Sequence, residues 1–152
     1  MKKIILPAVL SVALLAASTP ALAHRSAERQ SAVPQTAKPV EIERITAEEL
    51  KSKIEKNEPV TIIDARSKSS YGPSDKKIKG AIRIPEESVA ARSKDIPRDK
   101  EVVIYCACPD DGTSVRVARQ LLELGFKRAR ALKGGWNAWL QAHGPVESKP
   151  KL

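Results

Sequence analysis

The sequence predicts an α/β domain built on a small, mostly parallel β-sheet that is flanked by helices. Short apolar runs rich in Val and Ile occur along the chain together with segments of helical periodicity, which is the pattern of βαβ units. The apolar runs show little polar alternation, as expected for strands that are buried on both faces. A chain of 152 residues is long enough for one such domain with a single core.

The first predicted element of the domain is a helix. Thr46 can cap it by accepting a hydrogen bond from the backbone N–H of Glu49, and the Glu49 carboxylate can return the contact to the backbone of Thr46. Leu50 and Ile54 follow at helical spacing and give this helix one apolar face.

Four strands and two more helices follow along the chain. One helix begins near Ser114 and stops at Gly125, which suits a left-handed helix end. The last helix runs from about Trp136 to Ala142 and is ended by Gly144. The strands are expected at residues 60–64, 81–84, 102–105 and 128–132. Because open parallel sheets bind ligands beyond the carboxyl ends of their strands, the functional site is expected at that edge.

The N-terminal residues have the features of a signal peptide. Lys2 and Lys3 form a basic start, residues 4–17 are mainly apolar, and Ala21-Leu22-Ala23 matches a signal peptidase site. The apolar run is about 14 residues long, shorter than the roughly 20 that a spanning helix needs. We therefore expect cleavage after Ala23, a periplasmic or secreted protein, and no membrane contact after cleavage. The predicted parts of the chain are a signal peptide (1–23), a flexible lead (24–41), the domain (42–147) and a tail (148–152).

The composition is strongly basic. The chain has 27 Lys and Arg against 18 Asp and Glu, and loss of Lys2 and Lys3 with the signal peptide would leave 25 against 18. Basic and acidic residues alternate along the chain, and aromatic residues make up only 3%. Both features argue against a nucleic-acid partner. The excess positive charge is expected to aid solubility or to attract small anions, and the protein is expected to be a monomer.

The candidate reactive residue is Cys106, which follows the predicted strand at 102–105. The next segment leads into a helix near Ser114, so the sulfur is expected to lie at a helix N-terminus, where unpaired N–H groups favour thiolate. The pKa of Cys106 is therefore predicted to lie below its ordinary value of about 8.5. Gly112 permits a positive φ, which would turn successive N–H groups inward. The loop expected to cradle an anion on the sulfur consists of Ala107, Cys108, Pro109, Asp110, Asp111, Gly112, Thr113 and Ser114.

Three residues of this loop carry further expectations. Asp110 and Asp111 would repel a dianionic ligand and would raise the pKa of a nearby thiol, against the effect of the helix terminus. Cys108 is a candidate resolving thiol because it lies two residues from Cys106 and precedes Pro109, which favours an extended backbone. A disulfide between the two cysteines would then be strained and easily reduced. The alternative is that Cys108 is an ordinary loop residue.

Four motifs occur in an order that resembles the signature of rhodanese domains. They are Asp64-Ala65-Arg66, residues 77–82, Tyr105-Cys106 and residues 132–139. The resemblance covers about residues 42–147 and implies a five-stranded parallel sheet flanked by helices. No cofactor is expected. The resemblance also implies that Cys106 carries sulfur as a persulfide between a small sulfur donor and a thiol or thiophilic acceptor. In many members a His stands where Lys77 stands here, and the loop is shorter and often cationic, so ordinary use of thiosulfate is not expected.

Other residues near the predicted site have supporting roles. Asp64 and Arg66 are two residues apart on a continuing strand, and we expect them to form a structural pair that orders the loop beneath the site. Arg116 lies one turn into the helix, where it either faces donor anions or is a solvated charge. Gly134-Gly135 is expected to form the turn that lets the last helix pack through its tryptophans.

Two other kinds of chemistry are argued against by the residues present. Cysteine phosphatases and arsenate reductases need an Arg six residues after the nucleophile, and here Gly112 or Ser114 stands six residues after either cysteine. Zinc usually needs four ligands, and the two histidines, His24 and His143, are far from the cysteines in the sequence. No metal site is therefore predicted.

The function predicted from these features is that of a periplasmic sulfurtransferase with the persulfide on Cys106. Two alternatives stay open. One is a thiol-disulfide redox protein that uses Cys106 and Cys108 with a protein redox partner. The other is a non-catalytic domain that keeps the fold and only binds a partner.

Overall fold

The computed structural model describes residues 40–150 and confirms the α/β class with a five-stranded parallel sheet. The strand order is β1-β6-β5-β2-β4, so β5 is central. The strands are β1 (Arg44–Ile45), β2 (Val60–Asp64), β4 (Ile82–Arg83), β5 (Glu101–Tyr105) and β6 (Ala129–Leu132). All but β1 match the predicted runs to within one residue at each end. The predicted signal peptide, most of the predicted lead with His24, and the last two residues lie outside the described residues.

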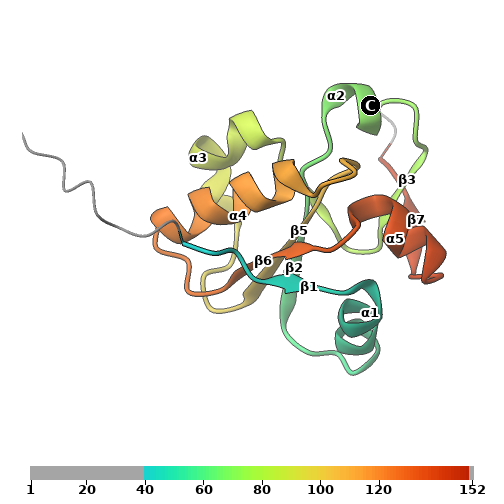
Figure 1. The fold of residues 1–152 in the computed structure, drawn as a ribbon, viewed down its shortest axis with the longest axis horizontal. Helices are drawn as coiled ribbons and strands as arrows, with labels where there is room; N and C mark the ends of the chain where they lie inside the picture. The colour runs from blue at the N-terminus through green and yellow to red at the C-terminus, as the bar shows by residue number, and fades with distance from the viewer. Residues whose placement is uncertain (1–39, 151–152) are drawn as a thin grey trace, which may run out of the picture. The chain divides into compact units, whose positions relative to one another are not determined.

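Helices cover both faces of this sheet (Figure 1). The helices α3 and α4 pack on one face, and α1 and α5 pack on the other. Neighbouring residues of β5 serve the two faces in turn, since Ile104 belongs to the apolar cluster under α4 and Val103 to the cluster under α1 and α5. This double burial explains why the strands are apolar without alternation. The helices are α1 (Ala47–Glu55), α3 (Val89–Arg92), α4 (Gly112–Glu123) and α5 (Gly135–Gln141).

The predicted helix ends are largely confirmed. Thr46 Oγ1 accepts the hydrogen bond from the N–H of Glu49 at 3.1 Å. The expected return contact is wrong, because the Glu49 carboxylate accepts a hydrogen bond from Arg130 Nη1 at 2.8 Å, and a charged donor competes well against a neutral N–H. The helix α4 begins at Gly112, two residues before Ser114, and it stops before Gly125, whose φ of 87° is left-handed.

Several short elements were not predicted. A second sheet of two antiparallel strands pairs residues far apart in the chain, Lys76 with Ser148 and Ile78 with Val146. These strands contain mainly polar residues, and the second one reaches Ser148, which was assigned to the tail. The unpredicted elements are α2 (Lys68–Tyr71), β3 (Lys76–Ile78), η1 (Glu86–Ser88), η2 (Ser93–Asp95) and β7 (Val146–Ser148), together with β1 and α3. Such short segments carry too little periodicity to be read from the sequence.

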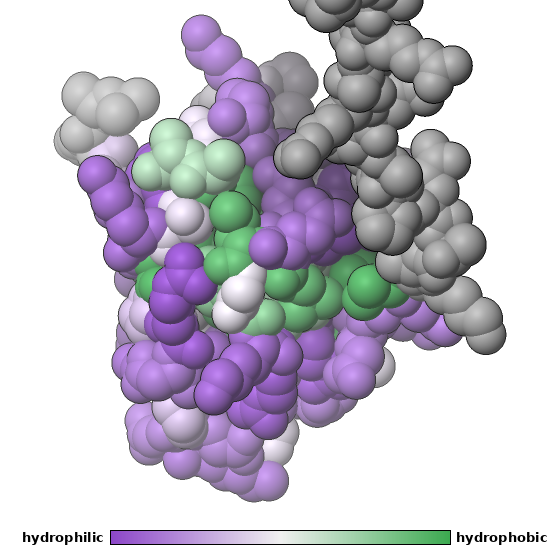
Figure 2. All heavy atoms as spheres, turned by 90° about the vertical axis from the view of Figure 1, so that its left-hand side faces the viewer, coloured by the Kyte–Doolittle hydropathy of each residue, from purple (hydrophilic) through white to green (hydrophobic). Residues whose placement is uncertain are grey.

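A group of basic residues lies before the strands β5 and β6, at the edge of the sheet opposite the candidate cysteine. Figure 2 views the side on which α4 ends and shows a mostly hydrophilic face around a central apolar group. Four basic residues line one hollow together with Asp99: Arg98, Lys100, Lys127 and Arg128. They precede β5 and β6, whereas Cys106 follows the carboxyl end of β5. No helix within residues 40–150 is long and apolar enough to cross a membrane.

Candidate functional site

Cys106 lies between the carboxyl end of the central strand β5 and the N-terminus of α4, as predicted. Its Sγ accepts hydrogen bonds from the backbone N–H of Cys108 and from the Ser114 hydroxyl, both at 3.3 Å. The residue is fully buried, and its thiol is free. Ser114 Oγ also lies 3.2 Å from the Asp111 carbonyl oxygen, so its single hydrogen is shared between two acceptors. The site thus holds the sulfur in place with neutral donors.

The predicted low pKa of Cys106 is wrong for the thiol in this setting. Burial raises the pKa of the Cys106 thiol, and the hydrogen bonds from Ser114 and from the Cys108 N–H only partly offset this effect. The helix terminus favours thiolate, as the sequence argument held, but the loss of water around a fully buried sulfur costs more. Burial therefore favours the protonated form of the Cys106 thiol.

Cys108 has the opposite character. It is half-buried, and its Sγ lies 3.2 Å from the Thr113 hydroxyl oxygen. Burial raises the pKa of Cys108, but hydrogen bonds from Thr113 and Cys106 outweigh it, and the net direction is downward. Asp110 acts against this lowering, as the sequence predicted for the acidic loop. The more accessible of the two cysteines is therefore also the one that ionises more readily.

The expectation that Asp111 would repel a dianionic ligand from the loop is corrected, because its carboxylate is not exposed. Its side chain is buried, and Oδ2 accepts a hydrogen bond from the Gly134 N–H at 3.1 Å. Asp111 also takes the left-handed conformation expected of Gly112, with φ of 58° at the residue before α4. Aspartate tolerates this conformation because its short side chain can bond locally. Asp110 remains exposed and accepts a hydrogen bond from the Gly112 N–H at 3.2 Å.

The turn before α5 forms a wall of the site. Gly134 and Gly135 both have positive φ, 70° and 49°, which confirms the predicted turn. A Cβ on Gly135 would lie 2.2 Å from the Cys106 carbonyl oxygen, so only glycine fits there. The Trp136 N–H donates to that same oxygen at 2.8 Å. Of the remaining loop residues, Ala107 packs on the cluster under α1 and α5, and Pro109 is exposed.

Asp64 and Arg66 form a buried ion pair, as predicted. Arg66 Nη2 donates to Asp64 Oδ2 at 2.6 Å, and Nε reaches both carboxylate oxygens. The Tyr105 hydroxyl also donates to Oδ2 at 2.6 Å, a contact that the sequence did not predict. The Arg66 guanidinium lies over the Trp136 ring, with 4.5 Å from Cζ to the centroid. These contacts tie β2, β5 and the start of α5 together below the cysteine loop.

Arg116 is paired with a carboxylate that the sequence argument missed. Its Nε and Nη2 donate to the two oxygens of Glu86 at 2.6 and 2.8 Å. A hydrogen bond from Arg116 lowers the pKa of Glu86. Arg116 Nη2 also donates to Thr113 Oγ1 at 3.2 Å. Glu86 lies 30 residues away in η1, and no pattern in the sequence links the two.

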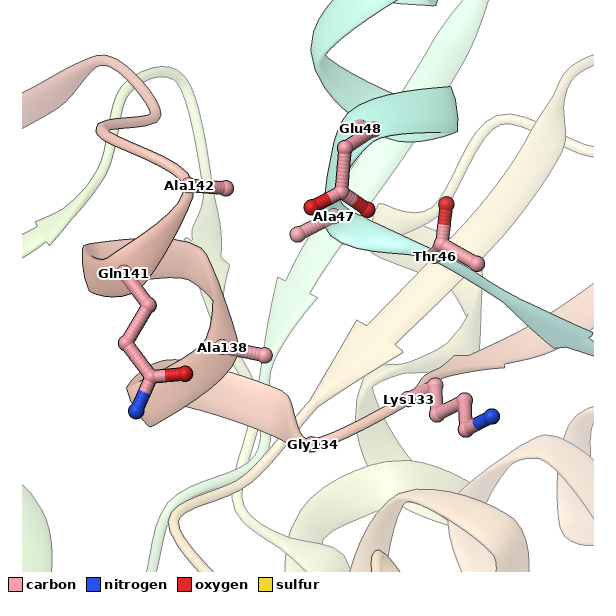
Figure 3. A pocket seen from close by; sticks show the side chains of 8 residues that line it. All are labelled: Thr46, Ala47, Glu48, Lys133, Gly134, Ala138, Gln141 and Ala142. Carbon is pink, nitrogen blue, oxygen red and sulfur yellow. The ribbon is translucent and has the colours of Figure 1, made fainter.

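The hollow drawn in Figure 3 is separate from the cysteine site. It has a volume of about 430 Å³ and lies between the N-terminus of α1 and α5. The turn at Gly134 lines it, whereas Cys106 and its loop do not. Lys77 donates a hydrogen bond to the Ala81 carbonyl oxygen and forms an ion pair with Glu147. Within residues 40–150, no group of three or more His, Cys, Asp or Glu side chains is placed to hold a metal ion.

Comparison with known proteins identifies relatives of the whole domain. A family model described as a rhodanese-like domain matches residues 46–142. A sulfurtransferase of Allochromatium vinosum is 29% identical over 105 residues, which cover 69% of this chain and 94% of the relative. The thiosulfate sulfurtransferase GlpE of Coxiella burnetii is 30% identical over 96 residues, 63% of this chain and 85% of the relative. The solved rhodanese-like domain of the Anabaena protein Alr3790 has 33% identity and a TM-score of 0.59, covering 70% of this chain and 79% of that one.

Proposed function

The chain belongs to the rhodanese-like family, and from this premise we propose that it is an exported sulfurtransferase that carries sulfane sulfur as a persulfide on Cys106. Relatives named as sulfurtransferases align over most of their own length, which supports this activity. The observation that carries the proposal is the position of Cys106 Sγ, after the central strand and 3.3 Å from both the Cys108 N–H nitrogen and Ser114 Oγ.

In the proposed reaction Cys106 Sγ attacks the outer sulfur of the donor as a thiolate, and the proton lost from the thiol is taken up by the leaving group. A bond forms between Cys106 Sγ and that sulfur, and the remainder of the donor leaves with the electron pair of the broken bond. An acceptor thiolate then attacks the outer sulfur, and Cys106 Sγ leaves as a thiolate. The N–H of Cys108 and the hydroxyl of Ser114 stabilise the negative charge each time it returns to Sγ. Between loading and transfer, burial of Cys106 limits the access of water to the persulfide.

The proposed donor carries less negative charge than thiosulfate, as the persulfide of a small thiol does. Arg116 is the first basic residue after Cys106 in the sequence, and its guanidinium is already paired with Glu86. Asp110 adds an exposed negative charge to the loop. A dianion approaching this loop would meet an unpaired carboxylate and a guanidinium that is engaged elsewhere.

Export is part of the proposal and is supported by the basic start, the apolar run and the Ala21-Leu22-Ala23 end of the leader. N-terminal sequencing of the protein purified from whole cells of its host tests it. A mature chain that begins at His24 is expected. A chain that still begins at Met1 would contradict the periplasmic location.

Mass spectrometry of the protein after incubation with glutathione persulfide tests the sulfurtransferase proposal. We expect a mass increase of one sulfur atom on Cys106 in the parent and in a Cys108→Ser variant, and transfer of that sulfur to a thiol acceptor. A Cys106→Ser variant should not sustain transfer. If the parent never carries sulfur on Cys106, the proposed function is refuted, and the redox and non-catalytic alternatives remain.

A further inference from the structure

The two cysteines of the site differ in exposure. Cys106 has 0% of its surface exposed, whereas Cys108 is half-buried and lies on the solvent side of the loop. A bulky thiol can reach the sulfur of Cys108 more easily than the sulfur of Cys106. The residue proposed to store the persulfide is thus the one that an acceptor reaches least well.

The polar contacts around Cys108 support an ionised sulfur. Thr113 Oγ1 accepts a hydrogen bond from Arg116 Nη2 at 3.2 Å and lies 3.2 Å from Cys108 Sγ. Because that oxygen already accepts from Arg116, the hydroxyl hydrogen is available to donate to the sulfur. Glu86 holds the Arg116 guanidinium in place through two hydrogen bonds. Charge on Cys108 is therefore stabilised by a hydroxyl that a guanidinium polarises.

The backbone of Cys108 fixes its position relative to Cys106. The Cys108 N–H donates to Cys106 Sγ at 3.3 Å, so the two residues lie against each other across one intervening alanine. An outer sulfur on Cys106 would consequently be formed beside the Cys108 side chain. Cys108 is thus partly exposed, has a hydroxyl beside its sulfur and lies next to Cys106, which are the features expected of a nucleophile that acts on Cys106.

From these contacts we propose that Cys108 takes the sulfane sulfur from Cys106 and presents it to the acceptor, so that the two cysteines form a relay. This proposal rests on the proposed function, since it requires a persulfide on Cys106. It makes Cys108 a second sulfur-carrying residue. The buried cysteine stores the sulfur and the accessible one exchanges it.

The relay step balances without an oxidant or a reductant. The Cys108 thiolate attacks the outer sulfur of the Cys106 persulfide, and a new bond forms between Cys108 Sγ and that sulfur. The bond from the outer sulfur to Cys106 Sγ breaks, and Cys106 leaves as a thiolate. The proton stays on the outer sulfur, which is now bound to Cys108. The negative charge passes from Cys108 to Cys106 Sγ, where hydrogen bonds from the Cys108 N–H and the Ser114 hydroxyl stabilise it. An external thiolate then removes the sulfur from Cys108.

The test follows the position of the sulfur after loading with glutathione persulfide. Samples are alkylated at intervals and digested with trypsin, which yields the peptide Glu101–Arg116 with both cysteines. Fragmentation at Ala107 separates sulfur on Cys106 from sulfur on Cys108. Discharge is then measured with reduced glutathione for the parent, Cys108→Ser, and the matched pair Thr113→Val and Thr113→Ser, of which only the second keeps the hydroxyl.

We expect sulfur on both cysteines of the parent and discharge about tenfold or more slower from Cys108→Ser, because the intramolecular step is lost. Thr113→Val should discharge more slowly than Thr113→Ser, which should resemble the parent. Sulfur found only on Cys106, with equal discharge from the parent and Cys108→Ser, would overturn the relay. Release of sulfide with formation of a Cys106–Cys108 disulfide would overturn it too and would make Cys108 a resolving thiol. Absence of sulfur from both cysteines of the parent would instead refute the proposed function itself.

Discussion

Two polar clusters lie at the carboxyl edge of the sheet, and they differ in how their charges are matched. Below the cysteine loop, Asp64 and Arg66 are oppositely charged, share several hydrogen bonds and also engage Tyr105. In the loop itself, Cys106 is met by an N–H and a hydroxyl, which are neutral. In the first cluster the two charges neutralise each other, although Arg66 Nη1 is buried without a hydrogen-bond partner among residues 40–150. In the second, the two donors stabilise Cys106 Sγ mainly when it is a thiolate.

This difference separates a stabilising group from a reactive one. The carboxylate and guanidinium are buried and neutralise each other. If either one lost its charge, the other would be left buried without a counter-charge, so both stay charged. A buried thiol with neutral donors can gain and lose charge, because the donors remain in place in both states. Changes in the first cluster should therefore act on stability, and changes in the second should act on sulfur transfer.

The largest effect is expected from Asp64→Ala. It leaves the Arg66 guanidinium buried without its counter-charge and the Tyr105 hydroxyl without its acceptor, and should lower the free energy of unfolding by about 3–5 kcal/mol. Urea denaturation followed by circular dichroism measures this. The control is Asp95→Ala, which breaks the exposed pair with Arg92 and should cost less than about 1 kcal/mol. Equal losses in the two variants would show that the buried pair is no more stabilising than the exposed one.

Ser114→Ala should act mainly on sulfur loading. The variant removes one of the donors to Cys106 Sγ, and we expect loading by glutathione persulfide to slow about tenfold, with a stability loss of about 1 kcal/mol. Rapid alkylation and mass spectrometry give the rate. Ser93→Ala is the matched control, because its hydroxyl donates to the Ala90 carbonyl oxygen in an exposed position at the end of α3. Unchanged loading in Ser114→Ala would show that the Ser114 hydroxyl has no part in the chemistry.

The two cysteines should alkylate in a defined order as the pH rises. Because the thiolate is the reactive form, the lowered pKa of Cys108 means that it reacts at lower pH, and the raised pKa of Cys106 means that it reacts later. Iodoacetamide labelling over a pH series, read on the tryptic peptide, measures the order. In Thr113→Val the reaction of Cys108 should move to higher pH, since a donor to its thiolate is lost. Prior labelling of Cys106 at neutral pH would contradict these directions.

The smallest effect is expected from Asp110→Asn. Removing one exposed carboxylate from the loop should raise thiosulfate use only a few-fold at low salt, and the gain should fade at high salt, because exposed charges are screened. Thiosulfate turnover with a thiol acceptor is the measurement. Asp99→Asn, which makes the same change of charge before β5, should have no effect. A gain that persists at high salt would indicate a steric cause in place of a charge effect.

The sequence alone determined the elements whose signal is local. The strands β2 and β5 were predictable because double burial favours a mainly apolar run, and α4 was predictable from apolar spacing that ends at Gly125. The position of Cys106 between β5 and α4 followed from that order. The strands β1, β3 and β7 were not predictable, because two or three residues in a strand carry no period and depend on partners far along the chain.

Only the tertiary structure decided how the site residues are charged and paired. The chain order places Cys106 at a helix N-terminus, but its raised pKa depends on how completely distant segments cover it. Asp111 points to Gly134 and Arg116 to Glu86 through contacts across 23 and 30 residues, and no local pattern encodes them. Residue types and order along the chain decide which groups can react. Burial and long-range partners decide which of these groups react, because the solvation and the pairing of a side chain depend on the folded structure.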